Sequence, residues 1–147
     1  TSLTSRDLEA QVREFIIPNK ESPPINLVFR SFGFKRGVPL DADFVFDVRC
    51  LSNPRWEKGL EALTGLDDDT KKYLDGLPMV DDLYNDIRDF LSKWIPECEK
   101  NSKIYLTLAI GCTGGQHRSV YMAQRLAEHL ADDYDNVLVR HRELNRR

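Results

Sequence analysis

The feature that most constrains this chain is a buried-strand pattern followed at once by a glycine-rich segment and an amphipathic helix. Residues 104–110 are almost continuously apolar, as expected for a strand covered on both faces. Residues 111–119 are rich in glycine, and apolar residues then recur at helical spacing over residues 120–130. A strand, a tight turn and a helix in this order are typical of a parallel sheet in an α/β domain.

The rest of the chain alternates in the same way. We expect strands over residues 25–30, 44–48 and 136–140, and helices over 4–16, 80–95 and, more briefly, around 60–63 and 70–74. The chain has 147 residues, of which 41% are hydrophobic and 31% charged, which fits one globular domain. The sequence therefore predicts an α/β fold, a three-layer sandwich with a mostly parallel sheet.

The glycine-rich segment 111–119 concentrates residue types that bind anions. Glycines after a buried strand allow a turn that points backbone N–H groups inward, and the next helix N-terminus carries a partial positive charge. Hydroxyl groups and a guanidinium add further donors. We predict that a phosphate or carboxylate binds to Thr113, Gly114, Gly115, Gln116, His117, Arg118 and Ser119. The alternative is a structural turn, with Ser119 as helix cap and Arg118 in solvent.

Cys112 and Arg118 have a Cys-x5-Arg spacing that resembles the signature loop of protein tyrosine phosphatases. In that loop the thiolate attacks phosphorus and the arginine holds the phosphoryl oxygens. Here Gly111 replaces the usual histidine before the cysteine, and no loop stands out as the source of an aspartic general acid. The leading hypothesis is therefore a binding domain without catalytic residues. A phosphatase that uses Cys112 and Arg118 is the alternative, and a small buried residue is the structural explanation of Cys112.

A second group of residues, mostly polar, clusters after predicted strand ends and comprises Arg30, Lys35, Arg36, Asp47, Arg49, Asn53, Arg55 and Trp56. Asp47 and Arg49 would supply a polar wall for hydroxyl or amine groups of a small ligand, and Arg55 comes shortly after them. Because the C-terminal ends of parallel strands share one edge of the sheet, we expect these residues to reach the same face as segment 111–119. The alternative is ordinary surface charge, with Trp56 in the core.

The C-terminus is basic although the chain as a whole is acidic. The formal net charge is −3, yet residues 136–147 contain four arginines and one glutamate. Residues 66–89 instead contain eight aspartates against three basic residues. A basic tail either solubilises a chain end or contacts nucleic-acid phosphates. We predict that RNA is contacted by Arg140, Arg142, Arg146 and Arg147.

Other kinds of site have no pattern in this sequence. There is neither a G-x-x-x-x-G-K-[ST] phosphate loop nor a G-x-G-x-x-G loop, and the three histidines have no metal-ligand spacing. Three cysteines are too few for a disulfide framework and fit a reducing compartment. No apolar run approaches the roughly 18 residues of a membrane span. We therefore predict a cytoplasmic domain that holds no metal or cofactor and contacts no membrane.

Together these motifs resemble the C-terminal domain of the RapZ family, bacterial RNase adapter and nucleotide-binding proteins. The resemblance covers the chain from about residue 25 onward, and the loops 31–37 and 111–119 are its most specific parts. The stretches of sequence that carry the resemblance are Ser31-Phe-Gly-Phe-Lys-Arg-Gly-Val-Pro39, residues 41–49, Asn53-Pro54, and residues 63–67, 105–121 and 140–142. It implies a fold like the sugar-phosphate-binding part of phosphofructokinases. Members often carry a histidine after Asn53-Pro54, where this chain has Arg55.

The resemblance implies a regulator. Enteric members of the family bind small regulatory RNA, present it to an endoribonuclease, and sense glucosamine-6-phosphate. Other members are known mainly as nucleotide-binding proteins. Carried over by position, the metabolite site comprises Thr113, Gly114, Gly115, His117 and Arg118, with Asp47 and Arg49 nearby, and the C-terminal arginines contact RNA. Ligand and RNA would then compete for a shared face.

The resemblance also implies a domain organisation. Family members carry an N-terminal P-loop domain, which would bind ATP or GTP. Residues 1–24 would be the linker helix and linker from that missing domain, and residues 25–147 the metabolite- and RNA-binding domain. We also expect a homo-oligomer. The apolar stripe over residues 80–95, which includes Trp94, is large enough for a dimer face and would make a structural or oligomerisation domain a further alternative, although core packing explains the stripe equally well.

Overall fold

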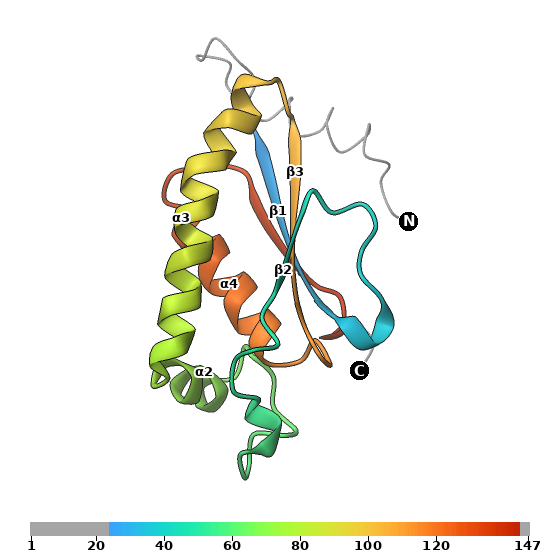
Figure 1. The fold of residues 1–147 in the computed structure, drawn as a ribbon, viewed down its shortest axis with the longest axis vertical. Coiled ribbons are helices and arrows are strands. Elements are labelled where there is room, and N and C mark those ends of the chain that lie inside the picture. The colour runs from blue at the N-terminus through green and yellow to red at the C-terminus, as the bar shows by residue number, and fades with distance from the viewer. Residues whose placement is uncertain (1–23, 145–147) are drawn as a thin grey trace.

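The computed structural model describes residues 24–144, which form a parallel sheet with helices packed against it (Figure 1). The strands are β1 (Asn26–Gly33), β2 (Phe44–Asp47), β3 (Tyr105–Cys112) and β4 (Val137–His141). The helices are α2 (Asp68–Asp75), α3 (Pro78–Lys100) and α4 (Arg118–Leu130), with 3-10 helices η1 (Phe34–Arg36) and η2 (Pro54–Trp56). The helix predicted over residues 4–16 lies outside the described residues.

The predicted strands and long helices are confirmed, with two differences in detail. Helix α3 continues through Pro96 to Lys100, five residues past its predicted end. Residues 60–63 form turns where a short helix was expected, because Gly59 has a φ of +89° and the next N–H groups bond three residues back. Helix α2 begins only after Asp67, whose side chain accepts a hydrogen bond from the N–H of Thr64.

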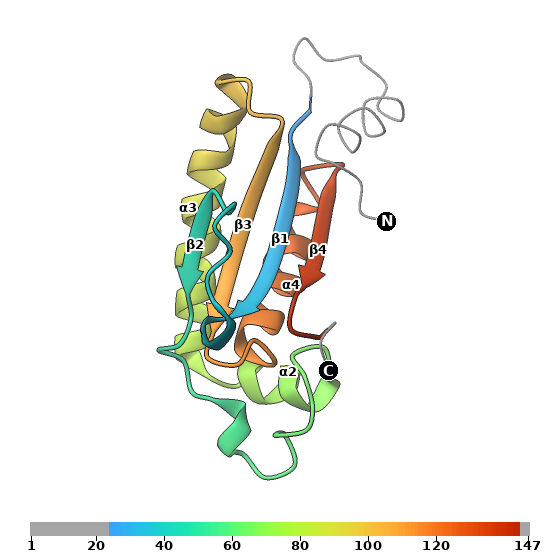
Figure 2. The ribbon, with the colours of Figure 1, turned by 90° about the vertical axis from the view of Figure 1, so that its right-hand side faces the viewer.

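The strand order is β2-β3-β1-β4, and every pair is parallel. The connections from β2 to β3 and from β3 to β4 step in the same direction across the sheet. Because such crossovers are right-handed, they place α3 and α4 on the same face, as Figures 1 and 2 show. The connection from β1 to β2 steps the other way, and η1 with the loop after it lies on the opposite face. The predicted fold class, an α/β sandwich on a parallel sheet, is confirmed.

The core lies between the sheet and the two long helices. Phe29 and Leu108 on the strands and Leu91, Met122 and Leu126 on the helices are fully buried. On the other face of the sheet, outer-strand side chains such as Val45 and Leu138 are partly exposed, so the near-continuous burial predicted for the central strands does not extend to the edges. No helix in residues 24–144 is long and apolar enough to cross a membrane.

Candidate functional site

A pocket of about 650 Å³ opens beyond the C-terminal ends of the two central strands. Gly33, which ends β1, pairs with Cys112, which ends β3, and the chain leaves these strands toward opposite faces of the sheet. Such a switch point is where open α/β sheets bind ligands. The pocket is lined by Lys35, Asn53, Arg55, Glu61, Cys112, Thr113, Gly114, Gln116, His117 and Arg118.

Two glycines bring the loop after β3 against the end of β1. A Cβ on Gly33 would lie 2.6 Å from the carbonyl carbon of Gly114, so no larger residue fits there. Gly115 has a φ of +73°, and its Cβ would lie 2.4 Å from Cγ of Glu143. Backbone bonds fix the same loop from both sides, since Lys35 N–H donates to Thr113 O at 3.1 Å and Gly65 N–H donates to Gln116 O at 2.8 Å. The pocket wall is therefore a tightly packed turn.

Arg118 is buried in this wall, not in solvent as the structural alternative required. Its side chain is 4% exposed, and Nη1 donates to the carbonyls of Arg49 at 2.8 Å and Leu51 at 2.9 Å. Nη2 donates to Oγ1 of Thr113 at 3.4 Å. Its Nε is buried without a hydrogen-bond partner among the described residues. The guanidinium thus joins the 49–51 turn to the pocket loop and places a buried positive charge in the pocket wall.

Further donors surround Arg118. Gly114 lines the pocket, and no hydrogen bond from its backbone N–H is found in the described part of the chain. Nε2 of His117 lies 3.0 Å from the carbonyl of Leu60 and orients this buried ring. Lys35 and Arg55 are exposed and add two positive charges at the wall. The arrangement of cations and N–H groups suits an anionic ligand.

Cys112 is 2% exposed, and its sulfur contacts Ser119. The Sγ atom lies 3.1 Å from Oγ of Ser119 and accepts a hydrogen bond from the Ser119 N–H at 3.4 Å. Ser119 is therefore not the helix cap, a position that His117 occupies. In a phosphatase loop the arginine would point its guanidinium at the phosphoryl group, whereas Nη1 of Arg118 faces backbone carbonyls.

Six of the ten predicted ligand residues line the pocket: Arg55, Thr113, Gly114, Gln116, His117 and Arg118. Gly115 and Ser119 lie behind this wall and support it. Lys35, Asn53 and Glu61 line it as well. Lys35 and Asn53 belong to the second polar group that was expected to reach this face, although neither was predicted as a ligand residue. Nothing in the sequence around Glu61 places it here.

Asp47 and Arg49 are not among the lining residues and instead bind each other. Arg49 donates to both carboxylate oxygens of Asp47, with Nη2 at 2.6 Å from Oδ2, and its guanidinium stacks 3.8 Å from the ring centre of Phe34. The hydrogen bond from Arg49 holds the pKa of Asp47 below its ordinary value. This pair braces η1 and the 47–49 turn, which in turn hold Lys35 and Arg118 in place.

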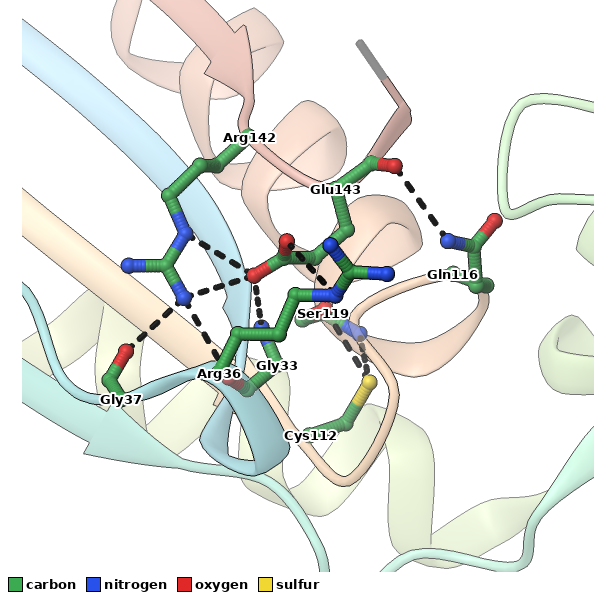
Figure 3. A network of polar contacts seen from close by, with 8 residues as sticks. All are labelled: Gly33, Arg36, Gly37, Cys112, Gln116, Ser119, Arg142 and Glu143. Carbon is green, nitrogen blue, oxygen red and sulfur yellow. Dashed lines mark hydrogen bonds and ion pairs between the residues drawn. The ribbon is translucent and has the colours of Figure 1, made fainter. Parts of the chain in front are cut away.

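A buried carboxylate ties the C-terminal segment to the pocket loop (Figure 3). Glu143 is 1% exposed, and its Oε2 accepts hydrogen bonds from the Gly33 N–H at 2.9 Å and from Arg142 at 2.7 Å. Arg36 approaches the other oxygen at 3.8 Å. Nε2 of Gln116, on the pocket wall, donates to the carbonyl of Glu143 at 3.4 Å. From the sequence, Glu143 was only the single acidic residue of the basic segment 136–147, and no structural role was predicted for it.

The four arginines predicted to contact RNA differ in their surroundings. Arg140 is exposed on β4, beside Arg30 in the sheet register. Arg142 is turned inward, where Nη2 donates to the carbonyls of Gly33 and Gly37 as well as to Glu143. Arg146 and Arg147 lie outside the described residues. Within residues 24–144, no three His, Cys, Asp or Glu side chains gather as a metal site would require.

Comparison with known proteins places this geometry in a family. The family model described as RapZ C-terminal domain matches residues 25–145. A nucleotide-binding protein of Shewanella halifaxensis is 49% identical over 98% of this chain, and one of Paraburkholderia xenovorans is 52% identical over 97%. A third, from Saccharophagus degradans, is 46% identical over 99%. These matches cover 50%, 47% and 50% of the relatives, so the chain spans about half their length.

Proposed function

The chain belongs to the RapZ C-terminal domain family, and from this premise we propose that it is a regulatory binding domain whose pocket takes a phosphorylated amino sugar, glucosamine-6-phosphate. The observation that carries the proposal is the pocket at the switch point of the sheet, which is lined by three cationic side chains, Lys35, Arg55 and the buried Arg118. A phosphate dianion matches this concentration of donors. The pocket volume of about 650 Å³ suits a ligand of this size.

Glu61 supports an amino sugar over a plain sugar phosphate. It is the one acidic side chain among the residues that line the pocket in the described chain. An ammonium group on the ligand would bind to it while the phosphate binds to the cations. The pocket lining thus offers an acidic group for the amine of glucosamine-6-phosphate and basic groups for its phosphate.

Calorimetry tests the metabolite site. We expect Lys35→Gln to weaken glucosamine-6-phosphate binding by roughly tenfold, since a charge-assisted hydrogen bond is lost. Lys72→Gln, on an exposed position of α2, is the matched control and leaves the affinity unchanged. Glucose-6-phosphate, in which a hydroxyl replaces the amine, should bind to the wild-type chain more weakly than glucosamine-6-phosphate does. In Glu61→Gln the affinities for the two sugar phosphates should be similar. Equal affinities of all variants for glucosamine-6-phosphate would remove the pocket from the proposal.

We further propose that the domain binds small regulatory RNA and presents it to an endoribonuclease. Support comes from the exposed Arg140 and from Lys35 and Arg36, the basic residues of η1. Like the pocket, η1 lies at the C-terminal ends of the strands (Figure 2). Ligand and RNA phosphates would then draw on the same positive charge, so that one displaces the other. Fluorescence anisotropy checks this, because added glucosamine-6-phosphate should release a labelled structured RNA and glucose-6-phosphate should release less.

The domain is proposed to be non-catalytic. The burial of Cys112 and the attachment of Arg118 to backbone carbonyls support this, as does the name of the relatives, which are called nucleotide-binding proteins. An aryl phosphate should not be hydrolysed by the chain. Hydrolysis that disappears in Cys112→Ser would instead establish the phosphatase alternative.

The remaining proposals concern the whole protein. We assign the binding of ATP or GTP to the half of the relatives that this chain does not span. We also propose a homo-oligomer located in the cytoplasm. Trp94 on α3 is 41% exposed and packs against Phe90, which offers one apolar patch for a subunit contact. Sedimentation of the wild-type chain and of Trp94→Gln tests that contact.

A further inference from the structure

Trp56 stands out as an exposed aromatic side chain beside the pocket. It is 78% exposed at the end of η2, although tryptophan is normally well covered. This contradicts the expectation of a core residue. The two residues before it are Pro54, which is buried, and Arg55, which lines the pocket. The indole therefore belongs to an anchored segment whose preceding residue lines the pocket.

The short helix that carries Trp56 is fixed at both ends. Oδ1 of Asn53 accepts a hydrogen bond from the Arg55 N–H at 3.0 Å, and the Glu57 N–H donates to the Pro54 carbonyl at 2.9 Å. The Arg55 guanidinium lies 5.5 Å from the centre of the indole ring. A cation over an aromatic face, next to a pocket built for an anion, is a surface that combines stacking with phosphate binding.

We propose that Trp56 and Arg55 form a stacking platform for an unpaired nucleobase, whose phosphate enters the pocket beside Lys35. A nucleotide unit is the ligand class that joins an aromatic face to a phosphate, and unpaired bases of RNA are commonly stacked on aromatic and arginine side chains. The proposal rests on the RNA-binding function proposed above, and it adds a base contact at η2 to the phosphate contacts of the C-terminal arginines. A free mononucleotide offers the same chemistry and is compared directly in the test.

Intrinsic fluorescence and affinity test the platform. The chain contains two tryptophans, so Trp94→Phe leaves Trp56 as the sole reporter, and binding of an adenosine decamer should quench it. Trp56→Leu should weaken decamer binding at least fivefold, whereas Trp56→Phe should retain most of the affinity. The matched control is Met79→Ala, which removes another exposed apolar side chain at the start of α3 and should bind like the wild type. Denaturant midpoints confirm that each variant is folded.

The decamer is compared with two other probes. An abasic decamer keeps the phosphates without the bases, so wild type and Trp56→Leu should bind it equally. AMP reveals whether a free nucleotide is a source of the base, since it would then quench Trp56 as strongly as the decamer does. The platform is overturned if Trp56→Leu binds the decamer like the wild type, or if the variant loses only the binding of a ribonuclease, which would make Trp56 a protein contact.

The same data separate this inference from the proposed function. Glucosamine-6-phosphate should bind to Trp56→Leu with wild-type affinity, because the indole is not among the residues that line the pocket. If RNA binds and Trp56 has no effect, only the platform is wrong. If the wild-type chain binds neither decamer nor structured RNA, the RNA function fails and the platform fails with it.

Discussion

The carboxylate of Glu143 accepts a hydrogen bond from the backbone N–H of Gly33 at 2.9 Å, across 110 residues of sequence. The two residues belong to the C-terminal segment and to the end of β1. Through this bond the segment that follows β4 closes over the loop that forms the pocket wall (Figure 3). The pocket loop and residues 142–143 are therefore parts of one hydrogen-bonded unit.

Replacing this carboxylate should destabilise the fold. Glu143→Gln removes the charge that Arg142 and the Gly33 N–H share in a buried position, and we expect a loss of about 1–3 kcal/mol in the free energy of unfolding. Urea denaturation measures it. Glu128→Gln, at an exposed position of α4, is the control and should change stability by less than about 0.5 kcal/mol. Identical midpoints for the two variants would mean that the Glu143 network contributes little.

Gly115 and Gly114 should respond differently to the same substitution. Gly115→Ala places a Cβ 2.4 Å from Glu143 at a φ of +73°, so we expect a loss of about 1–3 kcal/mol and a weakened metabolite site. A Cβ on the neighbouring Gly114 meets nothing within 4 Å, which makes Gly114→Ala the control for stability. Thermal unfolding of both variants checks the contrast. Equal melting temperatures would contradict the close packing of this loop.

The stability of the domain should fall in mild acid because of His141. Its Nδ1 lies 2.7 Å from Oγ of Ser31 and its Nε2 lies 3.0 Å from Oε1 of Gln124, and burial lowers its pKa below the ordinary value of 6.5. The unfolded chain therefore binds a proton near pH 6.5 that the folded chain binds only at lower pH. The free energy of unfolding should decrease as the pH falls below about 6.5.

Urea midpoints at several pH values between about 7.5 and 5.5 measure this dependence. His141→Gln should flatten it, since glutamine keeps hydrogen-bonding groups at this position but does not titrate. His129→Gln, on α4, should retain the wild-type dependence. A slope that is the same in wild type and His141→Gln would assign the acid sensitivity to other groups.

The two described arginines of the C-terminal segment should have separable effects. Arg140 is exposed, so Arg140→Gln should leave stability within about 0.5 kcal/mol but weaken RNA binding and reduce the salt slope by about one. Arg142 donates to two backbone carbonyls and to Glu143, so Arg142→Gln should cost about 1–3 kcal/mol of stability. Gel shifts over a range of salt, together with urea denaturation, distinguish them. Unchanged RNA affinity in Arg140→Gln would exclude it as a contact.

The features that the sequence predicts are those that depend on contacts between residues close together in the chain. The apolar run that becomes β3, the helix after it and the glycine-rich turn between them follow from local patterns, and so does the grouping of anion-binding residues in segment 111–119. The position of that segment at the C-terminal ends of the parallel strands also follows, because consecutive strands and helices leave few topologies. These properties depend on neighbours along the chain.

What only the tertiary structure decided are the roles of individual side chains. Arg118 faces the carbonyls of Arg49 and Leu51, roughly seventy residues away, and Glu143 supports Gly33 across the fold. Asp47 and Arg49 pair with each other outside the pocket, while Trp56 lies in solvent beside it. Whether a charged or aromatic group binds a ligand or supports the fold depends on which distant groups satisfy or cover it, and no local pattern encodes those partners.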